Sequence, residues 1–318
     1  AVECDAKDRH GRAKAALLAG KHVHIEKPPT VGLAEFRELL SLARDKNVLL
    51  QMGYMWRFNP GINAALEAAR QGWLGEVYLV RGVINTNISG DSRRSFGVIA
   101  GGTMYELGCH LIDPLVRLLG KHAKVTPVLR HDAKDADALA DNCVAVFDFK
   151  HAIGIISSAT MQPTSGAHRT FEIQGTNGVA IVRPIEQPVL TVDLAKDAGP
   201  YKKGSQTINF PPYARYVPEF AELAACVRSG KPLAVTPEQD ELVHEALLKA
   251  SGVTREGVLV ITAMRFREQE RNRADARARL NELLRRAATP PKPRRATKVP
   301  RSSKRKRLEN KKCRAEIK

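Results

Sequence analysis

The sequence predicts an α/β sheet domain followed by an α+β domain, and three successive patterns along the chain lead to this expectation. Residues 1–58 alternate between strand and helix patterns, which is typical of parallel βαβ units. Residues 59–253 hold many short β-rich runs separated by turn residues, which predict a mostly antiparallel sheet with helices. Residues 254–318 are strongly basic and poor in core residues. We therefore expect three parts with these boundaries.

In the first part, the elements can be assigned in order. Residues 1–4 suit a short strand, and a helix pattern over 9–20 ends at a glycine. A strand over 21–28 runs into a Pro-Pro loop, after which Thr30 is positioned to cap the next helix. The apolar run over 48–56 predicts a further strand. This order makes the strands parallel.

In the second part, Asn59 and Pro60 begin a helix. Another helix is expected near 103–119, and two more over 217–229 and 237–251. The predicted strands are the runs "VYLVRGVINT", "CVAVFDF", "IGIISSAT", "TFEIQ", "VAIVR", "VLTVD" and "TINF". The helix over 217–229 has an apolar stripe that we expect to face the core. That stripe consists of Phe220, Leu223, Ala224 and Val227.

The third part differs from the rest in charge. Residues 254–318 hold 22 Lys and Arg against 7 Asp and Glu, a net charge of +15, whereas residues 1–253 hold 29 against 27. Such an asymmetry favours an arm that binds a polyanion, and the alternative is an ordinary solvated surface. A charged helix is predicted over about 268–288, and the proline- and charge-rich remainder is predicted to be disordered when unbound.

Several classes of protein are disfavoured by composition. The five cysteines lie far apart without a CxxC pair, which argues against a metal site and for the reduced thiols of a cytoplasmic protein. No apolar run approaches the roughly 20 residues of a membrane span, and no secretory leader opens the chain. We therefore expect a cytoplasmic protein with no metal ion and no membrane contact.

Two runs carry a family resemblance: "AGKHVHIEKP" at 19–28 and "GGTMYELGCHLIDPLVRLLG" at 101–120. In this order and spacing they resemble the Gfo/Idh/MocA family of NAD(P)-dependent oxidoreductases. The resemblance implies a truncated Rossmann-type sheet in residues 1–58, a family α+β substrate and oligomerisation domain in 59–253, and NAD or NADP as cofactor. It also implies a sugar, a polyol or a similar alcohol or carbonyl compound as substrate.

The resemblance assigns roles to residues of both runs. It makes Lys27 the lysine that touches the nicotinamide ribose and the substrate hydroxyl, and His110 the residue that exchanges the proton. Glu26, Lys27 and Pro28 would form the cofactor wall. The family usually has Asp where this chain has Glu106, the residue expected to orient the site.

The residues themselves suit hydride transfer. Oxidising an alcohol needs a group that takes the hydroxyl proton and a cation that stabilises the alkoxide. Lys27 follows a parallel strand, at whose carboxyl end ligands bind in open α/β sheets. Glu106 and His110 are four residues apart and share a face if that stretch is helical. Arg57 follows the last parallel strand and could reach a cofactor phosphate or carboxylate, or else is a surface arginine.

One expected motif does not occur in the chain. No Gly-x-Gly-x-x-Gly loop lies between a strand and a helix, although such a loop and its helix N-terminus hold the cofactor pyrophosphate. We therefore expect weak or absent NAD(P) binding and no dehydrogenase turnover from this chain alone.

Residues 255–318 resemble the C-terminal half of ribosome-rescue peptidyl-tRNA hydrolases in the class I release-factor family, through "RFREQERNRADA", "PPKPRR" and "KRKRLENKK". The resemblance implies binding to the ribosome and its RNA, and a localisation-type or low-complexity tail is the alternative. No Gly-Gly-Gln occurs, so ester hydrolysis is not expected. The expected RNA-binding residues are Lys292, Arg294, Arg295, Arg301, Lys304, Arg305, Lys306, Arg307, Lys311 and Lys312.

The sequence therefore allows two alternative functions. One is an oxidoreductase relative, inactive as this chain, and the other is a ribosome- or RNA-binding protein that acts through its tail. The seam near 251–255 suggests a fused gene or a faulty gene model. The substrate and the choice between NAD and NADP stay open, and the open face of the large sheet suggests a homo-oligomer.

Overall fold

The computed structural model describes the chain except for residues 98, 136, 254–267 and 289–318. The chain divides into two compact units, Ala1–Val260 and Ile261–Lys318, and each is described by itself. The boundaries predicted at 58/59 and 253/254 stay predictions. Among the described residues, no helix has both the length and the apolar character that a membrane crossing requires.

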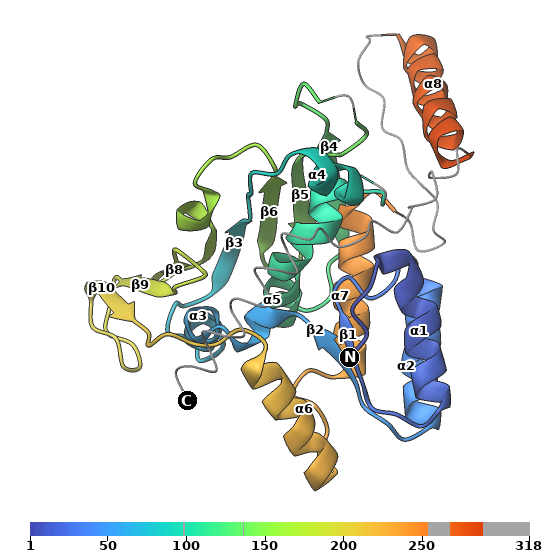
Figure 1. Ribbon diagram of the computed structural model, residues 1–318. Coiled ribbons are helices and arrows are strands. Elements are labelled where there is room, and N and C mark those ends of the chain that lie inside the picture. The colour runs from blue at the N-terminus through green and yellow to red at the C-terminus, as the bar shows by residue number, and fades with distance from the viewer. Residues whose placement is uncertain (98, 136, 254–267, 289–318) are drawn as a thin grey trace, which may run out of the picture. The chain divides into compact units, whose positions relative to one another are not determined.

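The first layer of the larger unit is a small parallel sheet with two helices, as predicted. Strand β1 (Val23–Glu26) pairs in parallel with β2 (Leu50–Gly53), and their residues are almost all buried. Helices α1 (Ala6–Leu18) and α2 (Leu33–Asp45) pack against each other beside this sheet (Figure 1). The strand predicted at residues 1–4 is reduced to a single bridge between Val2 and Ile25.

The predicted cap of α2 was wrong. The helix begins after Gly32, and Thr30 lies two residues before that cap. The Thr30 hydroxyl donates to the Gly32 carbonyl over 2.7 Å and lies 3.1 Å from Nε2 of His244. Thr30 therefore joins α2 to the distant helix α7 (Pro237–Ala250), a partner that local sequence cannot reveal.

A 3-10 turn, η1 (Met55–Phe58), and helix α3 (Pro60–Arg70) connect the small sheet to the large one. The prediction at the start of α3 is confirmed, because the Asn59 side chain accepts a hydrogen bond from the amide of Ile62.

The large sheet has eight strands in the order β10-β9-β8-β7-β3-β6-β5-β4. All neighbours are antiparallel except β3 and β6, which are parallel. Strand β4 was not expected, and it holds Pro127 because a residue without an amide hydrogen is tolerated on an edge strand. The strands are β3 (Val77–Val83), β4 (Lys124–Arg130), β5 (Asn142–Asp148), β6 (Ile153–Ala159), β7 (Thr170–Gly175), β8 (Gly178–Val182), β9 (Val189–Leu194) and β10 (Gly204–Asn209).

In the part of the chain that the structure describes, helices cover one face of this sheet and none covers the other. A π-helical segment, η2 (Met104–Gly108), continues into α5 (Cys109–Leu119), and α3, α5 and α7 pack on the covered face (Figure 1). A further 3-10 turn, η3 (Ser165–His168), precedes β7. The open face carries Val128, Val146 and Ile153, which are 52%, 38% and 48% exposed.

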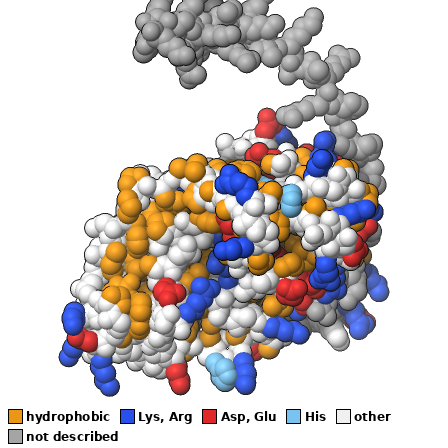
Figure 2. All heavy atoms as spheres, turned by 90° about the horizontal axis from the view of Figure 1, so that it is seen from below, with side chains coloured by type: hydrophobic (Ala, Val, Ile, Leu, Met, Phe, Trp, Pro, Cys, Tyr) orange, Lys and Arg blue, Asp and Glu red, His pale blue; other side chains and the backbone are white. Residues whose placement is uncertain are grey.

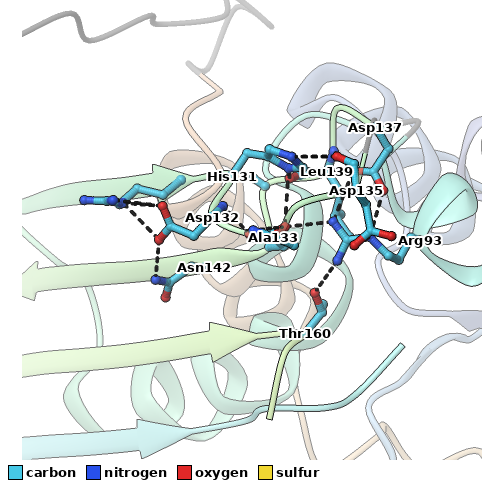
Figure 3. A network of polar contacts seen from close by, with 12 residues as sticks. Arg93, His131, Asp132, Ala133, Asp135, Asp137, Leu139, Asn142 and Thr160 are labelled. Atoms are coloured by element: carbon cyan, nitrogen blue, oxygen red, sulfur yellow. Dashed lines mark hydrogen bonds and ion pairs between the residues drawn. The ribbon is translucent and has the colours of Figure 1, made fainter. Parts of the chain in front are cut away.

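A buried arginine fixes the loop between β4 and β5 to helix α4 (Gly90–Phe96). Arg93 is 2% exposed and donates to Asp137 and Asp141 over 2.7 and 2.8 Å, and to the Thr160 hydroxyl (Figure 3). His131 lies in the same network, with its two ring nitrogens against backbone carbonyls of the loop. The contacts satisfy a buried cation that would otherwise cost several kcal/mol.

The prediction that the apolar stripe on α6 (Val217–Ser229) faces the core was wrong. Phe220 and Val227 are 44% and 42% exposed, whereas Glu219 and Cys226 are buried. The helix meets the body through a hydrogen bond from the Gln51 amide to the Glu219 carbonyl, and through the Phe220 ring, whose centroid lies 4.6 Å from that of His24. Figure 2 views the molecule from below relative to Figure 1, the side toward which α6 extends, and hydrophobic side chains are visible on this face.

In the second unit, α8 (Gln269–Ala288) is the charged helix that the sequence predicts over about 268–288. The basic residues expected to bind RNA, from Lys292 to Lys312, all lie outside the described residues.

Buried His244 should make the fold sensitive to acid. Burial lowers the pKa of His244 to about 3, so the folded chain keeps the ring neutral while the unfolded chain binds a proton near pH 6.5. Stability is therefore fully present above that pH and falls as the pH drops, by about 1.4 kcal/mol per pH unit. Urea unfolding between pH 7 and 5 should show a smaller fall for His244→Gln, and exposed His151→Gln is the control. An unchanged pH slope in His244→Gln would contradict this.

Candidate functional site

Lys27 lies just past the carboxyl end of β1 and points into the body of the protein. Its side chain is 9% exposed, and Nζ donates to Glu106 Oε1 over 2.7 Å and to the Glu106 carbonyl over 2.8 Å. The guanidinium of Arg9 donates to the carbonyls of Lys27 and Pro28, and these two hydrogen bonds fix the backbone at both residues. The lysine is thus held at the place where the sequence predicts a ligand.

The π-helical segment supplies the partner of Lys27. Glu106 lies within it, and His110 follows in the first turn of α5. π-Helical turns are rare and occur frequently at functional sites. His110 is 4% exposed, and its ring lies 5.3 Å from that of Trp56 and 6.5 Å from that of Tyr54 between ring centroids. Its Nδ1 is buried without a hydrogen-bond partner among the described residues.

The electrostatics of the site favour a charged lysine beside a neutral histidine. Burial opposes the ammonium charge of Lys27, but Cys109 and Glu106 outweigh it and raise the lysine pKa. Burial raises the pKa of the Cys109 thiol to about 12, so the Glu106 carboxylate is the counter-charge at neutral pH. Burial lowers the pKa of His110 well below its usual value, and the positive charges of Lys27, Arg169 and Arg215 add to this. The imidazole is therefore unprotonated, which is the form that a proton acceptor must have.

The remaining cofactor residues predicted at β1 lie beside Lys27. Glu26 ends β1, and burial raises the pKa of its carboxyl group. Its Oε2 lies 3.2 Å from the position that a Cβ would take on Gly53, at the end of β2. Pro28 is buried. Glu26 and Pro28 lie at the end of β1, where the sequence predicts the cofactor wall, and the chain contains no glycine-rich loop for the pyrophosphate.

Arg57 does not join this group. It is 8% exposed, and its guanidinium donates to Asp113 over 2.7 and 2.9 Å and to Asp240 over 2.5 Å. Its Cζ lies 4.8 Å from the centroid of the Tyr54 ring. We expected Arg57 to bind a phosphate or carboxylate of the cofactor or to lie on the surface. Its guanidinium is instead hydrogen-bonded to two carboxylates of the chain itself. We therefore correct its role to that of a buried structural cation.

A second set of polar contacts begins at Asn59, directly after η1, and was missed by sequence reasoning. Asn59 donates to the Ile185 carbonyl over 2.7 Å and to the Tyr213 hydroxyl over 3.0 Å, which ties two distant loops to η1. Next to Ile185, Glu186 pairs with Arg169. These residues come from loops more than a hundred positions apart from Asn59, and no local pattern marks them.

The comparisons with known proteins agree with this arrangement. Residues 6–54 match a family model described as "Oxidoreductase family, NAD-binding Rossmann fold", and residues 62–181 match one described as "GFO/IDH/MocA C-terminal domain". The matched segments end before residue 254, so the similarity of residues 255–318 to release factors stays a prediction.

Curated relatives are similar over much of the body. The chain is 29% identical to mouse trans-1,2-dihydrobenzene-1,2-diol dehydrogenase over 260 residues, which are 77% of this chain and 76% of that protein. Its bovine counterpart is 29% identical over 178 residues, 54% of this chain and 52% of that protein. The chain therefore spans about half of the bovine relative and three quarters of the mouse one.

Solved structures share the fold. Levoglucosan dehydrogenase in complex with NADH and levoglucosan superposes with a TM-score of 0.67 at 21% identity, covering 79% of this chain and 76% of that one. GenD2 from gentamicin A biosynthesis in complex with NAD gives a TM-score of 0.63 at 23% identity, covering 78% and 73%. At these identities the likeness concerns the fold alone.

The corrected role of Arg57 can be tested by unfolding. Arg57→Met leaves Asp113 and Asp240 buried without their cation, which should lower the free energy of unfolding by about 3–5 kcal/mol. The control is Arg44→Met, whose side chain is 71% exposed, and its effect should stay within about 1 kcal/mol. Urea unfolding at pH 7 measures both, and equal effects for the two variants would rule out the structural role.

Proposed function

The body of this chain belongs to the Gfo/Idh/MocA oxidoreductase family, and from this we propose that it carries the reaction site of an NAD(P)-dependent oxidoreductase. The reaction is hydride transfer at an alcohol or carbonyl carbon of a sugar, a polyol or a related compound. The observation that carries the proposal is the buried contact of Lys27 with Glu106, beside a neutral His110.

Each residue has a role in alcohol oxidation. The nicotinamide, when bound, supplies the hydride acceptor. His110 takes the hydroxyl proton, because its ring is neutral and its Nδ1 has no partner among the described residues. The Lys27 ammonium stabilises the negative charge that develops on the substrate oxygen. The reverse reaction uses the same groups with the proton moving from His110 to the substrate.

Glu106 is a positioning residue in this proposal. Its carboxylate accepts a hydrogen bond from Lys27 and, among the described residues, none from His110, so it orients the lysine. The extra carbon, relative to the Asp usual at this position in the family, reaches the lysine from the π-helical segment.

The relatives indicate the class of substrate. The curated relatives are named as dehydrogenases of a cyclic trans-diol, and one structural relative holds levoglucosan. Both are small cyclic compounds with hydroxyl groups, which supports a cyclic alcohol here. The pyrophosphate of the cofactor has no glycine-rich loop among these 318 residues, so we expect this chain alone to bind NAD(P) weakly.

The proposal predicts a sharp loss of turnover in two variants. Oxidation of sugars and polyols with NAD⁺ and NADP⁺ is measured on this chain and on a version that carries the glycine-rich segment of a family relative before residue 1. In the protein that turns over, Lys27→Met and His110→Asn should each lower kcat by about 100-fold or more. Matched controls are the exposed residues Lys21 and His151, changed in the same way. Turnover in neither protein, or equal effects of variants and controls, would refute the proposed reaction.

We also propose that the open face of the large sheet pairs two copies of the chain. Register places Val128 beside Val144, and Val146 beside Ile155, so that apolar side chains form neighbouring pairs on the open face of β4, β5 and β6. An exposed apolar surface of this kind commonly marks an interface between proteins. A second copy would present the same surface and cover it symmetrically.

Sedimentation velocity tests this pairing. The wild-type chain should sediment as a dimer, and Val146→Lys combined with Ile153→Lys should sediment as a monomer because two charges would be buried in the interface. Val217→Lys, at an exposed apolar residue of α6, is the control and should leave the dimer intact. A monomeric wild type, or a dimer that survives both lysines, would count against the pairing.

A further inference from the structure

The ring of His131 makes two hydrogen bonds that a neutral imidazole cannot make together. Its Nδ1 lies 2.8 Å from the carbonyl oxygen of Leu139, and its Nε2 lies 3.0 Å from that of Asp135 (Figure 3). A carbonyl oxygen only accepts hydrogen bonds, so each ring nitrogen needs a proton to make its contact. A neutral ring has one N–H and would turn a lone pair toward the second carbonyl. The geometry therefore requires the imidazolium form.

The buried charges around this ring balance only when it is protonated. Nδ1 of His131 lies 3.3 Å from Asp141 Oδ2 and 3.6 Å from Asp137 Oδ1. Arg93 of α4 binds both carboxylates but carries a single positive charge, and the imidazolium supplies the second. The other charged side chains of this region are Arg130 and Asp132, which pair with each other, the exposed Lys134, and Asp135, whose carboxylate lies 3.3 Å from Arg93.

These contacts make the proton part of the folded structure. They raise the pKa of His131 above its usual 6.5, first through the hydrogen bond to the Leu139 carbonyl and then through Asp141, although burial acts against them. The unfolded chain lacks these contacts. Their stabilising effect is therefore fully present below pH 6.5 and is lost as the pH rises through the raised pKa. The side chain is 34% exposed, so the ring can exchange its proton with solvent.

The β4–β5 loop, residues 131–141, supports the start of the π-helical segment. The Ala140 carbonyl accepts a hydrogen bond from the Thr103 amide over 3.0 Å. Gly102 lies so close to the loop that a Cβ on it would be 2.5 Å from the same carbonyl oxygen. Thr103 directly precedes η2, which carries Glu106. The loop that His131 closes thus contacts the residues that lead into the candidate site.

We propose that His131 is a pH-sensitive switch, which closes the β4–β5 loop against α4 and the start of η2 as an imidazolium and releases the loop when it loses its proton. The switch is independent of the proposed reaction, because it rests on contacts that involve neither Lys27 nor His110.

Nitrogen NMR of the histidine rings tests the protonation state in the full chain. The chain has nine histidines, and the signals of His131 are those that disappear in His131→Gln. At pH 6.5 both ring nitrogens of His131 should carry protons in more than half of the molecules, and the titration midpoint should lie above 6.5. A midpoint at or below 6.5 would overturn the inference.

Trypsin cleavage after the exposed Lys134 measures release of the loop. One pH unit below the midpoint, His131→Gln should be cleaved about tenfold faster than the wild type, because it lacks the charged hydrogen bonds. One pH unit above the midpoint, the two rates should agree within about twofold, since the wild-type ring is then mostly neutral as well. Comparing two proteins at the same pH cancels the pH dependence of trypsin itself.

The control is His151→Gln, at an exposed histidine, which should be cleaved like the wild type at both pH values. If the ratio of the His131→Gln rate to the wild-type rate is the same on both sides of the midpoint, the ring is a fixed structural group and the switch does not exist.

Discussion

The contact between the Lys27 ammonium and Glu106 is the interaction on which the candidate site depends. It joins the end of β1 in the small parallel sheet to the π-helical segment that packs on the large sheet. A buried lysine without a partner would lose its charge or be expelled, because desolvation of an ion costs several kcal/mol. By accepting two hydrogen bonds from the ammonium, Glu106 keeps the charge inside the protein. The two layers are thereby held together where the chemistry needs them.

The same constraint determines what His110 can do. The ring lies one turn after Glu106 and is enclosed by Trp56 and Tyr54, so burial keeps it neutral. A nearby cation strengthens this effect, since a second positive charge would be repelled. Lys27 and His110 thus have different protonation states at neutral pH although both side chains are basic. This division lets one group stabilise negative charge while the other accepts a proton.

Buried ion pairs elsewhere hold the frame around this site. Arg57 bridges Asp113 of α5 and Asp240 of α7, and its cation is balanced by carboxylates from two different helices. Arg93 performs a similar task for the loop between β4 and β5. Such groups contribute position more than stability, because the Coulomb attraction largely offsets the cost of desolvation. The residues of the site can then come from loops and still keep a fixed arrangement.

Side-chain periodicity and turn residues were enough to predict the elements whose cause is local. These are the parallel strands around 21–28 and 48–56, the Asn59 cap and most strands of the large sheet. The partners of the polar side chains, in contrast, depend on long-range packing. Thr30 binds His244 instead of capping its own helix, and Arg57 pairs with two aspartates instead of facing a ligand. Phe220 and Val227 of the α6 stripe stay partly exposed, while Gln51 bonds to the backbone of that helix. Periodicity specifies which residues share a face, but long-range packing specifies what that face meets.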